Sequence, residues 1–376
     1  MRFAFVIFRY FPYGGAQRDC LAIAQQLMTR GHEVAFFTRA WDGPPPGAPV
    51  HLVPASGLSN YTRDLSFTRG VAAQLHGFDA VVGFNRMPGL DIYYAADPCF
   101  RFRQAGRWGG LYRLAPRYRT YSRLEESVFS PQGLTQILFL TERQRREYVE
   151  SFGTPAERFH AVPPGISRRF PQLSDLRNSP TRTKRELGEA AFSLLLVASD
   201  FKTKGLDRGI RALAALPPAI RNNVRLVAAG SNDHAPYMRL ARRLGVHDRL
   251  TLMPPQEDIE PLLLAADILI HPSRLDTTGT VILEAVASGL PMLCTGTCGY
   301  AEHVTRAQAG VVLPHPFTQG ALNAALAQML HRSLLDKWSE GGAAYGRTAD
   351  LYRGRDVAAD LIEKLTAQKI SGRSRS

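Results

Sequence analysis

The stretch "DILIHPSRLDTTGTVILEAVASGLPMLCT" (residues 267–295) decides the fold class of this chain. It opens with a short apolar run, 267–272, and closes with another, 291–295, each as long as a buried strand. Between them, "TVILEAVASG" reads as a helix that Gly289 closes at its C-terminus. A strand, a helix and a second strand in this order predict a βαβ unit with parallel strands.

The same alternation runs along the whole chain in two series. We predict strands at 2–8, 32–38, 79–84 and 135–140 in the first half, and at 192–198, 224–230, 250–254, 267–272 and 291–295 in the second. The clearest helix of the first half opens at Gly15 and runs to about Arg30, where Gly31 ends it. The sequence therefore predicts an α/β protein with two Rossmann-like domains. Ligands of such sheets lie at the carboxyl ends of the strands, and the cleft between two facing domains is the default site.

A chain of 376 residues is too long for one typical core. The turn "VPPGI" (162–166) and the polar stretch "SDLRNSPTRTKRE" (174–186) indicate a domain boundary. We predict an N-terminal domain over 1–166 and a C-terminal domain over 167–340. Residues 341–376 would form a C-terminal helix that packs back on the N-terminal domain, with a disordered basic tail, "SGRSRS".

Composition narrows the class of protein. The hydrophobic fraction of 45% and charged fraction of 21% are ordinary for a globular protein, and no apolar run approaches the ~20 residues that span a bilayer. The first apolar run is too short for a signal peptide, so we expect a cytoplasmic protein. The four cysteines form no metal-ligand pattern and are interpreted as buried free thiols. The net charge of +13 requires an anionic partner, but nucleic acid, an anionic membrane and a phosphorylated substrate all satisfy it.

One candidate phosphate-facing loop follows the first strand, in "RYFPYGGAQRD". Gly14 and Gly15 lie where strand gives way to helix, so backbone N–H groups and the helix dipole can face an anion. The alternative is a tight turn that needs small residues. The spacing is not the dinucleotide fingerprint, and Asp19 could be no more than a favourable charge in the first turns of the helix.

A second candidate loop follows the strand at 192–198. Lys202 and Lys204 come directly after it, and Gly205 opens the next helix. Paired ammonium groups there could hold a diphosphate and neutralise charge that develops on a leaving phosphate. Two solvated loop lysines are the alternative.

Asp276 and Glu284 bracket seven uncharged residues. In a helix the two acids would lie about 12 Å apart along the axis, and with Asp276 in a loop a gap near 10 Å is still expected. That is too far to share a proton or to act as a retaining hydrolase pair. The distance suits hydrogen bonds to hydroxyls at opposite ends of one elongated ligand.

Between the acids, Thr278, Gly279 and Thr280 offer backbone N–H groups at a helix N-terminus, which suit a diphosphate. Hydroxyl, diphosphate and hydroxyl in this order is the layout of a nucleotide sugar. The alternative has Asp276 as a loop acid and Glu284 as a surface residue. Glu284 has few polar neighbours on its helix, so we expect it to be half buried with a partner.

"GTVILEAVASGLPMLCT" resembles the signature of retaining, nucleotide-sugar-dependent glycosyltransferases with the two-domain GT-B fold. "FRYFPYGGAQRD", "VVGFNRMPGLDIYYAAD", "VPPGI" and "TGTCGYAEHV" are similar to the lipopolysaccharide core glucosyltransferases, which add the first glucose to the inner-core heptose. The resemblance covers nearly the whole chain. It implies a UDP-sugar donor and an inner-core acceptor in the membrane.

The resemblance also implies roles for individual residues. Glu284 would bind the ribose hydroxyls, Asp276 the hydroxyls of the transferred sugar, and Lys204 the diphosphate. Gly14 and Gly15 would approach the diphosphate, while Asp19 and Asp97 would face the acceptor. Two positions depart from the family pattern: Asp276 replaces a Glu, and Thr203 stands where an Arg accompanies the lysine, so Lys202 would substitute for that Arg.

The resemblance implies front-face transfer with retention, in which the departing phosphate oxygen takes the acceptor proton. We expect no metal, since the chain contains no D-x-D motif, and no other cofactor.

Residues 100–123 hold seven arginines, interleaved with aromatic residues, and no acid. This pattern suits an anionic membrane surface, at about 1 kcal/mol for each well-placed charge. A solvated loop and helix with packing aromatics is the alternative. The expected location is the cytoplasmic face of the inner membrane, and the residues of this predicted membrane surface are Arg101, Arg103, Arg107, Trp108, Arg113, Arg117 and Arg119.

A hexosyltransferase that moves glucose from a UDP-sugar to the inner-core heptose explains the most features. Alternatives are a transferase for galactose or an N-acetylhexosamine, or for another glycolipid acceptor, and a sugar-nucleotide epimerase. A nucleic-acid-binding protein would explain only the charge, because no recognition motif accompanies it. The oligomeric state stays open.

Overall fold

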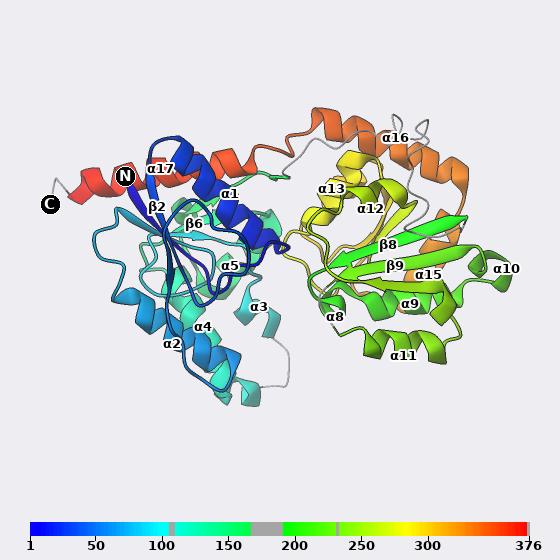
Figure 1. The fold of residues 1–376 in the computed structure, drawn as a ribbon, viewed down its shortest axis with the longest axis horizontal. Helices are drawn as coiled ribbons and strands as arrows, with labels where there is room; N and C mark the ends of the chain where they lie inside the picture. Colours follow the sequence, from blue (N-terminus) through cyan, green and yellow to red (C-terminus); the bar gives the residue numbers. More distant parts are fainter. Residues whose placement is uncertain (105–109, 167–190, 231–232, 374–376) are drawn as a thin grey trace. The chain divides into compact units, whose positions relative to one another are not determined.

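The computed structural model describes residues 1–104, 110–166, 191–230 and 233–373 (Figure 1). The chain forms two compact units, one of Met1–Gly165 with Arg353–Ser376 and one of Ile166–Tyr352. The chain returns to the first unit after Tyr352, later than the expected boundary at 340. The reason is that α16 (Arg332–Thr348) packs on α13 (Thr280–Ser288) of the second unit. The polar stretch 174–186 lies outside the described residues.

The first unit contains a seven-stranded sheet in the order β3-β2-β1-β4-β5-β6-β7, with every neighbouring pair parallel. All four predicted strands are present. The strands that the sequence pattern missed, β3, β5 and β7, are each three residues long. The strands are β1 (Arg2–Val6), β2 (Glu33–Thr38), β3 (Val50–Leu52), β4 (Ala80–Gly83), β5 (Ile92–Tyr94), β6 (Gln136–Phe139) and β7 (Phe159–Ala161).

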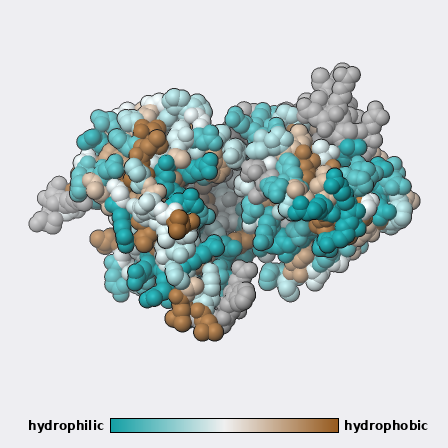
Figure 2. All heavy atoms as spheres, turned by 60° about the horizontal axis from the view of Figure 1, so that its bottom comes forward, coloured by the Kyte–Doolittle hydropathy of each residue, from teal (hydrophilic) through white to brown (hydrophobic). Residues whose placement is uncertain are grey.

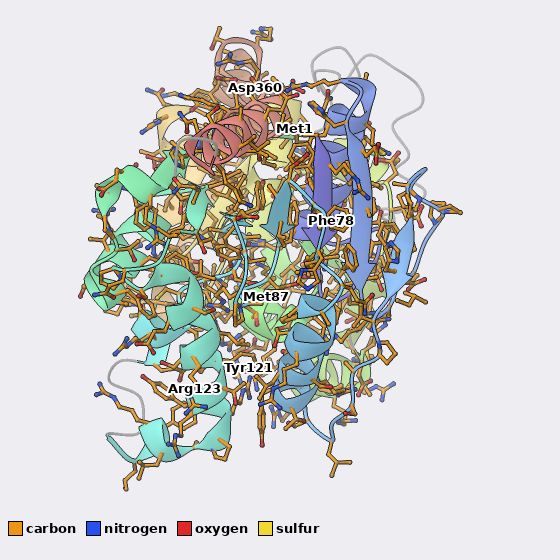
Figure 3. All side chains as sticks on the ribbon, turned by 90° about the vertical axis from the view of Figure 1, so that its left-hand side faces the viewer. Met1, Phe78, Met87, Tyr121, Arg123 and Asp360 are labelled. Atoms are coloured by element: carbon orange, nitrogen blue, oxygen red, sulfur yellow. The ribbon has the colours of Figure 1, made fainter. Side chains whose placement is uncertain are left out.

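Side chains of β1 alternate between two cores. Phe3 and Phe5 pack in a cluster with residues of α1 and α17, whereas Ala4 and Val6 pack in a cluster with residues of α2, α4 and α5. Tyr121 of α4 is labelled in Figure 3. Its hydroxyl donates a hydrogen bond of 3.0 Å to Asp64 of α2, which joins these two helices. The helices of this unit are α1 (Gly15–Thr29), α2 (Asn60–Ala72), α3 (Phe100–Gln104), α4 (Pro116–Phe129), α5 (Glu142–Phe152) and α17 (Gly354–Arg373), with short 3₁₀ turns at η1 (Gly110–Leu114) and η2 (Ala156–Arg158).

The C-terminal helix α17 lies along α1 (Figure 1). It buries Ala358, Ala359 and Ile362 in the same core as the β1 phenylalanines. The helix continues to Arg373, so half of the basic tail that we expected to be disordered is helical. Residues 374–376 lie outside the described part of the chain.

The second unit contains a six-stranded parallel sheet in the order β10-β9-β8-β11-β12-β13. The chain moves outward from β8 to β10 and then returns to β11 on the other side of β8. The strand order therefore reverses between β8 and β11, and such a switch point is where α/β sheets bind ligands. The strands are β8 (Phe192–Ala198), β9 (Val224–Gly230), β10 (Leu250–Met253), β11 (Ile268–His271), β12 (Met292–Thr295) and β13 (Gly310–Leu313).

Helices cover both faces of this sheet. Leu194 and Leu196 of β8 belong to one core and Leu195 to the other, as expected for a strand that is buried on both sides. The helices and 3₁₀ turn not yet given bounds are α8 (Phe201–Lys204), α9 (Leu206–Ala215), α10 (Pro218–Arg221), α11 (Ala235–Arg243), η3 (His247–Arg249), α12 (Glu260–Ala265), α14 (Ala301–Arg306) and α15 (Gln319–Met329). Among the described residues, no helix combines the length and apolar character needed to cross a membrane.

Candidate functional site

Two loops of the second unit meet at the switch point. After β8, the Asp200 side chain caps α8 by accepting from the Lys202 N–H at 3.1 Å. Lys202 and Lys204, which we expected in a loop, therefore lie in a one-turn helix. Gly205 follows with φ of 80°, and a Cβ there would lie 2.2 Å from the Pro272 carbonyl oxygen. Only glycine permits this approach of the lysine turn to the loop after β11.

The contact between these loops is an ion pair between Lys204 and Asp276. The Lys204 Nζ lies 2.5 Å from Asp276 Oδ2, and the His271 Nε2 lies 2.8 Å from the same oxygen. Asp276 and Lys204 are mostly buried, with side chains 10% and 17% exposed, and His271 is fully buried at the end of β11. The structure thus brings together Lys204 and Asp276 and adds His271, for which no sequence pattern predicted a role.

The charges of this cluster support one another. Burial by itself would raise the pKa of Asp276, but the Lys204 ammonium and the His271 imidazole outweigh it and hold that pKa well below its usual range. Burial would lower the pKa of His271, but the hydrogen bond to Asp276 dominates and raises it to about 9. Asp276 is therefore ionised at neutral pH.

The loop that carries Asp276 is fixed by the loop after β12. The Gly299 N–H donates to the Asp276 carbonyl at 3.0 Å, and the Tyr300 N–H donates to the Thr278 carbonyl at 2.8 Å. Asp276 and Cys298 form an isolated parallel bridge. These backbone contacts give the Asp276 carboxylate a defined position without help from a ligand.

Arg274 ties the lysine turn to the Asp276 loop. Its guanidinium donates to both carboxylate oxygens of Asp207 at 2.8 Å and to the Lys202 carbonyl at 2.6 Å. The backbone N–H of Arg274 donates to the Thr203 carbonyl at 2.8 Å. One residue therefore connects α8, the start of α9 and the loop after β11, and we call these contacts the Arg274 clamp.

The predicted helix between the acids is α13, which begins at Thr280 after Gly279 in the left-handed conformation, with φ of 81°. The first-turn N–H groups of a helix have no partner within the helix, so this end can face an anion. Glu284 is the fifth residue of α13. It is only 3% exposed, so it is buried rather than half buried.

The other predicted site residues lie in the first unit. Gly14 precedes α1 with an extended backbone, and a Cβ there would meet only the side chains of Gln17 and Phe11, at 2.1 Å and 2.6 Å. Gly15 is the first residue of α1. Both interpretations of this segment, a tight turn that needs small residues and a phosphate-facing loop, therefore stay predictions.

Asp19 uses both carboxylate oxygens within the protein. The Tyr94 hydroxyl donates to Oδ2 at 3.0 Å, and Arg355 Nε donates to Oδ1 at 3.0 Å. Asp19 thus links α1 to β5 and to the start of α17. Neither Tyr94 nor Arg355 stood out in the sequence, because both partners are far from Asp19 along the chain.

Asp97 follows β5 and has more open surroundings. Its side chain is 33% exposed, with Arg86 Nε at 3.8 Å and weak contacts of 3.5 Å from Asn85 Nδ2 and the Tyr93 hydroxyl. Arg86 is itself paired with the fully buried Glu125 of α4. Of the two first-unit acids, Asp97 is the one that leaves more of its carboxylate accessible.

The predicted membrane surface is described in part. Arg101, Arg103, Arg113, Arg117 and Arg119 are exposed on α3, η1 and α4, while Arg107 and Trp108 lie outside the described residues. Figure 2 shows several separate groups of hydrophobic residues, in brown, on a surface that is mostly hydrophilic.

Two leucines of η1 are exposed beside these arginines along the chain, Leu111 at 80% and Leu114 at 69%. Tyr118 and Tyr121, two of the aromatic residues that are interleaved with these arginines, pack on Phe100 with ring centroids 5.7 and 5.4 Å apart. The exposed apolar groups in this segment are therefore leucines rather than these two tyrosines.

One group of possible metal ligands occurs among the described residues. His271, Asp276 and Cys298 each bring one ligand atom within 4.8 Å of the others. The cysteine spacing alone gave no metal pattern, because the other two ligands come from β11 and the loop after it.

Comparisons with known proteins agree with this architecture. Residues 13–170 match the family model Glycosyltransferase Family 4, and residues 180–344 match Glycosyl transferases group 1. The chain is 39% identical over 365 residues to the lipopolysaccharide glucosyltransferase WaaG of Escherichia coli K12, covering 96% of this chain and 98% of that protein. It is 26% identical to a D-inositol 3-phosphate glycosyltransferase of Salinispora arenicola, covering 89% and 88%.

Solved structures give the same result. The crystal structure of WaaG superposes with a TM-score of 0.91 at 38% identity, covering 96% of this chain and 99% of that one. Anabaena Alr3699/HepE in complex with UDP and glucose superposes with a TM-score of 0.73 at 18% identity, covering 97% and 100%, which shows a shared fold.

Two parallel Rossmann-like sheets and a charged switch-point site define a glycosyltransferase of the GT-B class, as the sequence predicted. At 39% identity over almost its whole length, this chain belongs to the family that contains the lipopolysaccharide glucosyltransferase WaaG.

Proposed function

We propose that this chain is a retaining hexosyltransferase that moves glucose from UDP-glucose to the inner-core heptose of lipopolysaccharide. The Lys204–Asp276 pair carries the proposal. An ammonium and a carboxylate 2.5 Å apart suit a ligand in which phosphate and sugar hydroxyls are adjacent, as in a sugar 1-diphosphate. The similarity to WaaG supports glucose and the lipopolysaccharide acceptor.

In this proposal each donor group has a partner in the second unit. Lys204 and Lys202 contact the diphosphate, together with the N–H groups at Thr278, Gly279 and Thr280. Asp276 accepts hydroxyls of the glucose. Glu284 accepts the ribose hydroxyls, and its burial suits a hydrogen bond that water does not weaken.

The remaining roles belong to the first unit. Gly14 and Gly15 approach the diphosphate, while Asp19 and Asp97 serve the acceptor side. Because Asp19 is held by Tyr94 and Arg355, we assign it to positioning and assign the acceptor contact to Asp97.

The reaction then needs no protein nucleophile. The bond between the sugar carbon and the phosphate oxygen breaks, the acceptor oxygen bonds that carbon on the same face, and the acceptor proton passes to the departing phosphate. Lys204 and the α13 N-terminus stabilise the charge on the phosphate. No metal is assigned to this step, so activity should persist in excess chelator.

Release of UDP from a panel of UDP-sugars, with and without deacylated core lipopolysaccharide, tests the proposal. We expect acceptor-dependent release from UDP-glucose, with the anomeric configuration retained in the product. Lys204→Ala should lower the rate at least 100-fold, whereas Lys337→Ala, an exposed lysine of α16, should leave it unchanged. Faster release of UDP from UDP-galactose or a UDP-N-acetylhexosamine would show that one of these, and not UDP-glucose, is the donor. Formation of an epimerised UDP-sugar without acceptor would contradict a transferase.

We further propose that the enzyme binds the cytoplasmic face of the inner membrane, where an inner-core acceptor is anchored. Exposed arginines and leucines of α3, η1 and α4 support this, since basic and apolar groups together favour an anionic bilayer.

A further inference from the structure

His271, Asp276 and Cys298 place an imidazole nitrogen, a carboxylate oxygen and a thiol sulfur within 4.8 Å of one another. They come from the end of β11, the loop after β11 and the loop after β12. All three are largely withdrawn from water, with His271 and Cys298 only 1% and 3% exposed. Nitrogen, oxygen and sulfur ligands in one small space are typical of zinc sites.

The cluster is held in place before any cation binds. The backbones of Asp276 and Cys298 form a parallel bridge, and the Cys298 N–H donates to the Thr295 carbonyl at 3.1 Å. His271 ends a strand that is paired with β12 through Cys294. Nδ1 of His271 is buried without a hydrogen-bond partner among the described residues, so the protein does not satisfy this ring fully.

We propose that His271, Asp276 and Cys298 bind a thiophilic divalent cation such as Zn²⁺, and that the bound cation blocks the donor site. Binding would form bonds to nitrogen, oxygen and sulfur and release two protons, one from the Cys298 thiol and one from the His271 imidazolium. A fourth, tetrahedral position would hold water. A sulfur ligand selects against Mg²⁺ and Ca²⁺, which prefer oxygen.

Blocking follows from the contacts of Asp276. Lys204 and His271 both contact the same oxygen, Oδ2, so a cation at this carboxylate competes with the Lys204 ammonium and repels it. The cation therefore removes the lysine from its place beside Asp276 and engages the carboxylate itself. This inhibition rests on the proposed donor roles of Lys204 and Asp276, whereas the binding of the cation does not.

Cation binding is tested without turnover, with Co²⁺ as a coloured substitute for Zn²⁺. We expect the full-length protein to give a thiolate-to-Co²⁺ charge-transfer band that Zn²⁺ abolishes. Cys298→Ala should lose the band, and Cys294→Ala, which removes a buried thiol of β12, should keep it. If Cys298→Ala fails to fold, judged by its circular dichroism, Cys298→Ser replaces it. A missing band, or a band that survives loss of the Cys298 thiol, would overturn the site.

Inhibition is tested by UDP release in a Zn²⁺ titration. Zn²⁺ should inhibit the wild type and Cys294→Ala alike, and chelator should restore the rate. Cys298→Ala should need at least tenfold more Zn²⁺, relative to its own uninhibited rate, and Mg²⁺ should have no effect at these concentrations. Equal sensitivity of the two variants would show that Zn²⁺ acts on the nucleotide or elsewhere. A Cys298-dependent Co²⁺ band without inhibition would leave the cation site standing and refute the blocking mechanism.

Discussion

Asp276 is one of the two positions at which the sequence departs from the pattern of the family that it resembles, and charged partners enclose its carboxylate. Its carboxylate lies between Lys204 and His271, and its side chain is 10% exposed. The backbone bridge to Cys298 holds the loop that carries this carboxylate. The shorter acid therefore reaches Lys204 and His271 without a longer side chain.

Asp276→Glu should consequently lower kcat/KM for the preferred UDP-sugar by about tenfold, because the carboxylate moves towards the bound hexose. We also expect the ranking of UDP-sugars to change. Initial rates across the donor panel measure both effects. An unchanged ranking would mean that the shorter side chain has no part in donor choice.

The Arg274 clamp predicts a second effect on the same site. Arg274→Lys keeps the charge but loses the planar fork that holds Asp207 through two hydrogen bonds. Lys204 should then be less well placed against Asp276, with kcat/KM falling about tenfold and donor binding weakened. The matched control is Arg306→Lys in the exposed pair with Glu302, for which we expect no change. A loss of melting temperature with unaltered kinetics would reduce the clamp to a purely structural role.

At the scale of elements, α17 is attached to the C-terminal end of α1 by charges as well as by its apolar side chains. Arg30 contacts Glu363 at 2.6 Å and Asp360 at 2.8 Å, and His32 Nε2 contacts Glu363 at 2.5 Å. Burial alone would raise the pKa of Glu363, but His32 and Arg30 overcome it and lower that pKa. Ionised Glu363 therefore stabilises the packing of α17.

The depressed pKa sets the pH range of this stabilisation. It is fully present above the pKa of Glu363 in the unfolded chain and is lost as pH falls through the lower, folded value. Glu363→Gln should lower the melting temperature by about 2 °C at neutral pH, and this difference should shrink as the solution is acidified below about pH 4. Glu302→Gln, in an exposed pair, should show little difference at any pH. A Glu363→Gln difference that grows on acidification would contradict the sign of this argument.

The strength of the sequence pattern explains which elements could be predicted. Long apolar strands such as β8, and helices bounded by glycine such as α1 and α13, have strong local signals. The three-residue strand β5 does not, because its position depends on pairing with β4 and β6. The one-turn helix α8 was not predicted, because its Asp200 cap and Gly205 are informative only once the neighbouring loop is known.

The candidate site was likewise predictable only in part. Lys204 and Asp276 stood out because each follows a strand at its carboxyl end, and parallel topology then brings those ends together. His271, Arg274 and Cys298 did not stand out. Their roles arise from contacts between loops that follow different strands, which one linear sequence does not reveal.

At the scale of the whole molecule, the basic residues behind the net charge of +13 have different neighbours in different places. Exposed Arg113, Arg117 and Arg119 accompany the exposed leucines of η1, whereas Arg239, Arg242 and Arg243 on α11 form an equally exposed basic group. Electrostatic attraction alone would draw both groups to an anionic membrane. Insertion of apolar side chains into the membrane would in addition favour the η1–α4 segment.

Replacing Arg113, Arg117 and Arg119 together with Gln should therefore weaken binding to vesicles rich in anionic lipid by as much as about 100-fold, since each charge contributes about 1 kcal/mol. The same replacement of Arg239, Arg242 and Arg243 removes equal charge and should weaken binding far less. Leu111→Ser with Leu114→Ser should reduce binding at high salt, where apolar insertion remains and electrostatic attraction is screened. Sedimentation of each full-length variant with vesicles measures these effects. Equal losses from the two arginine triples would mean that net charge alone, and not the η1–α4 segment, holds the protein at the membrane.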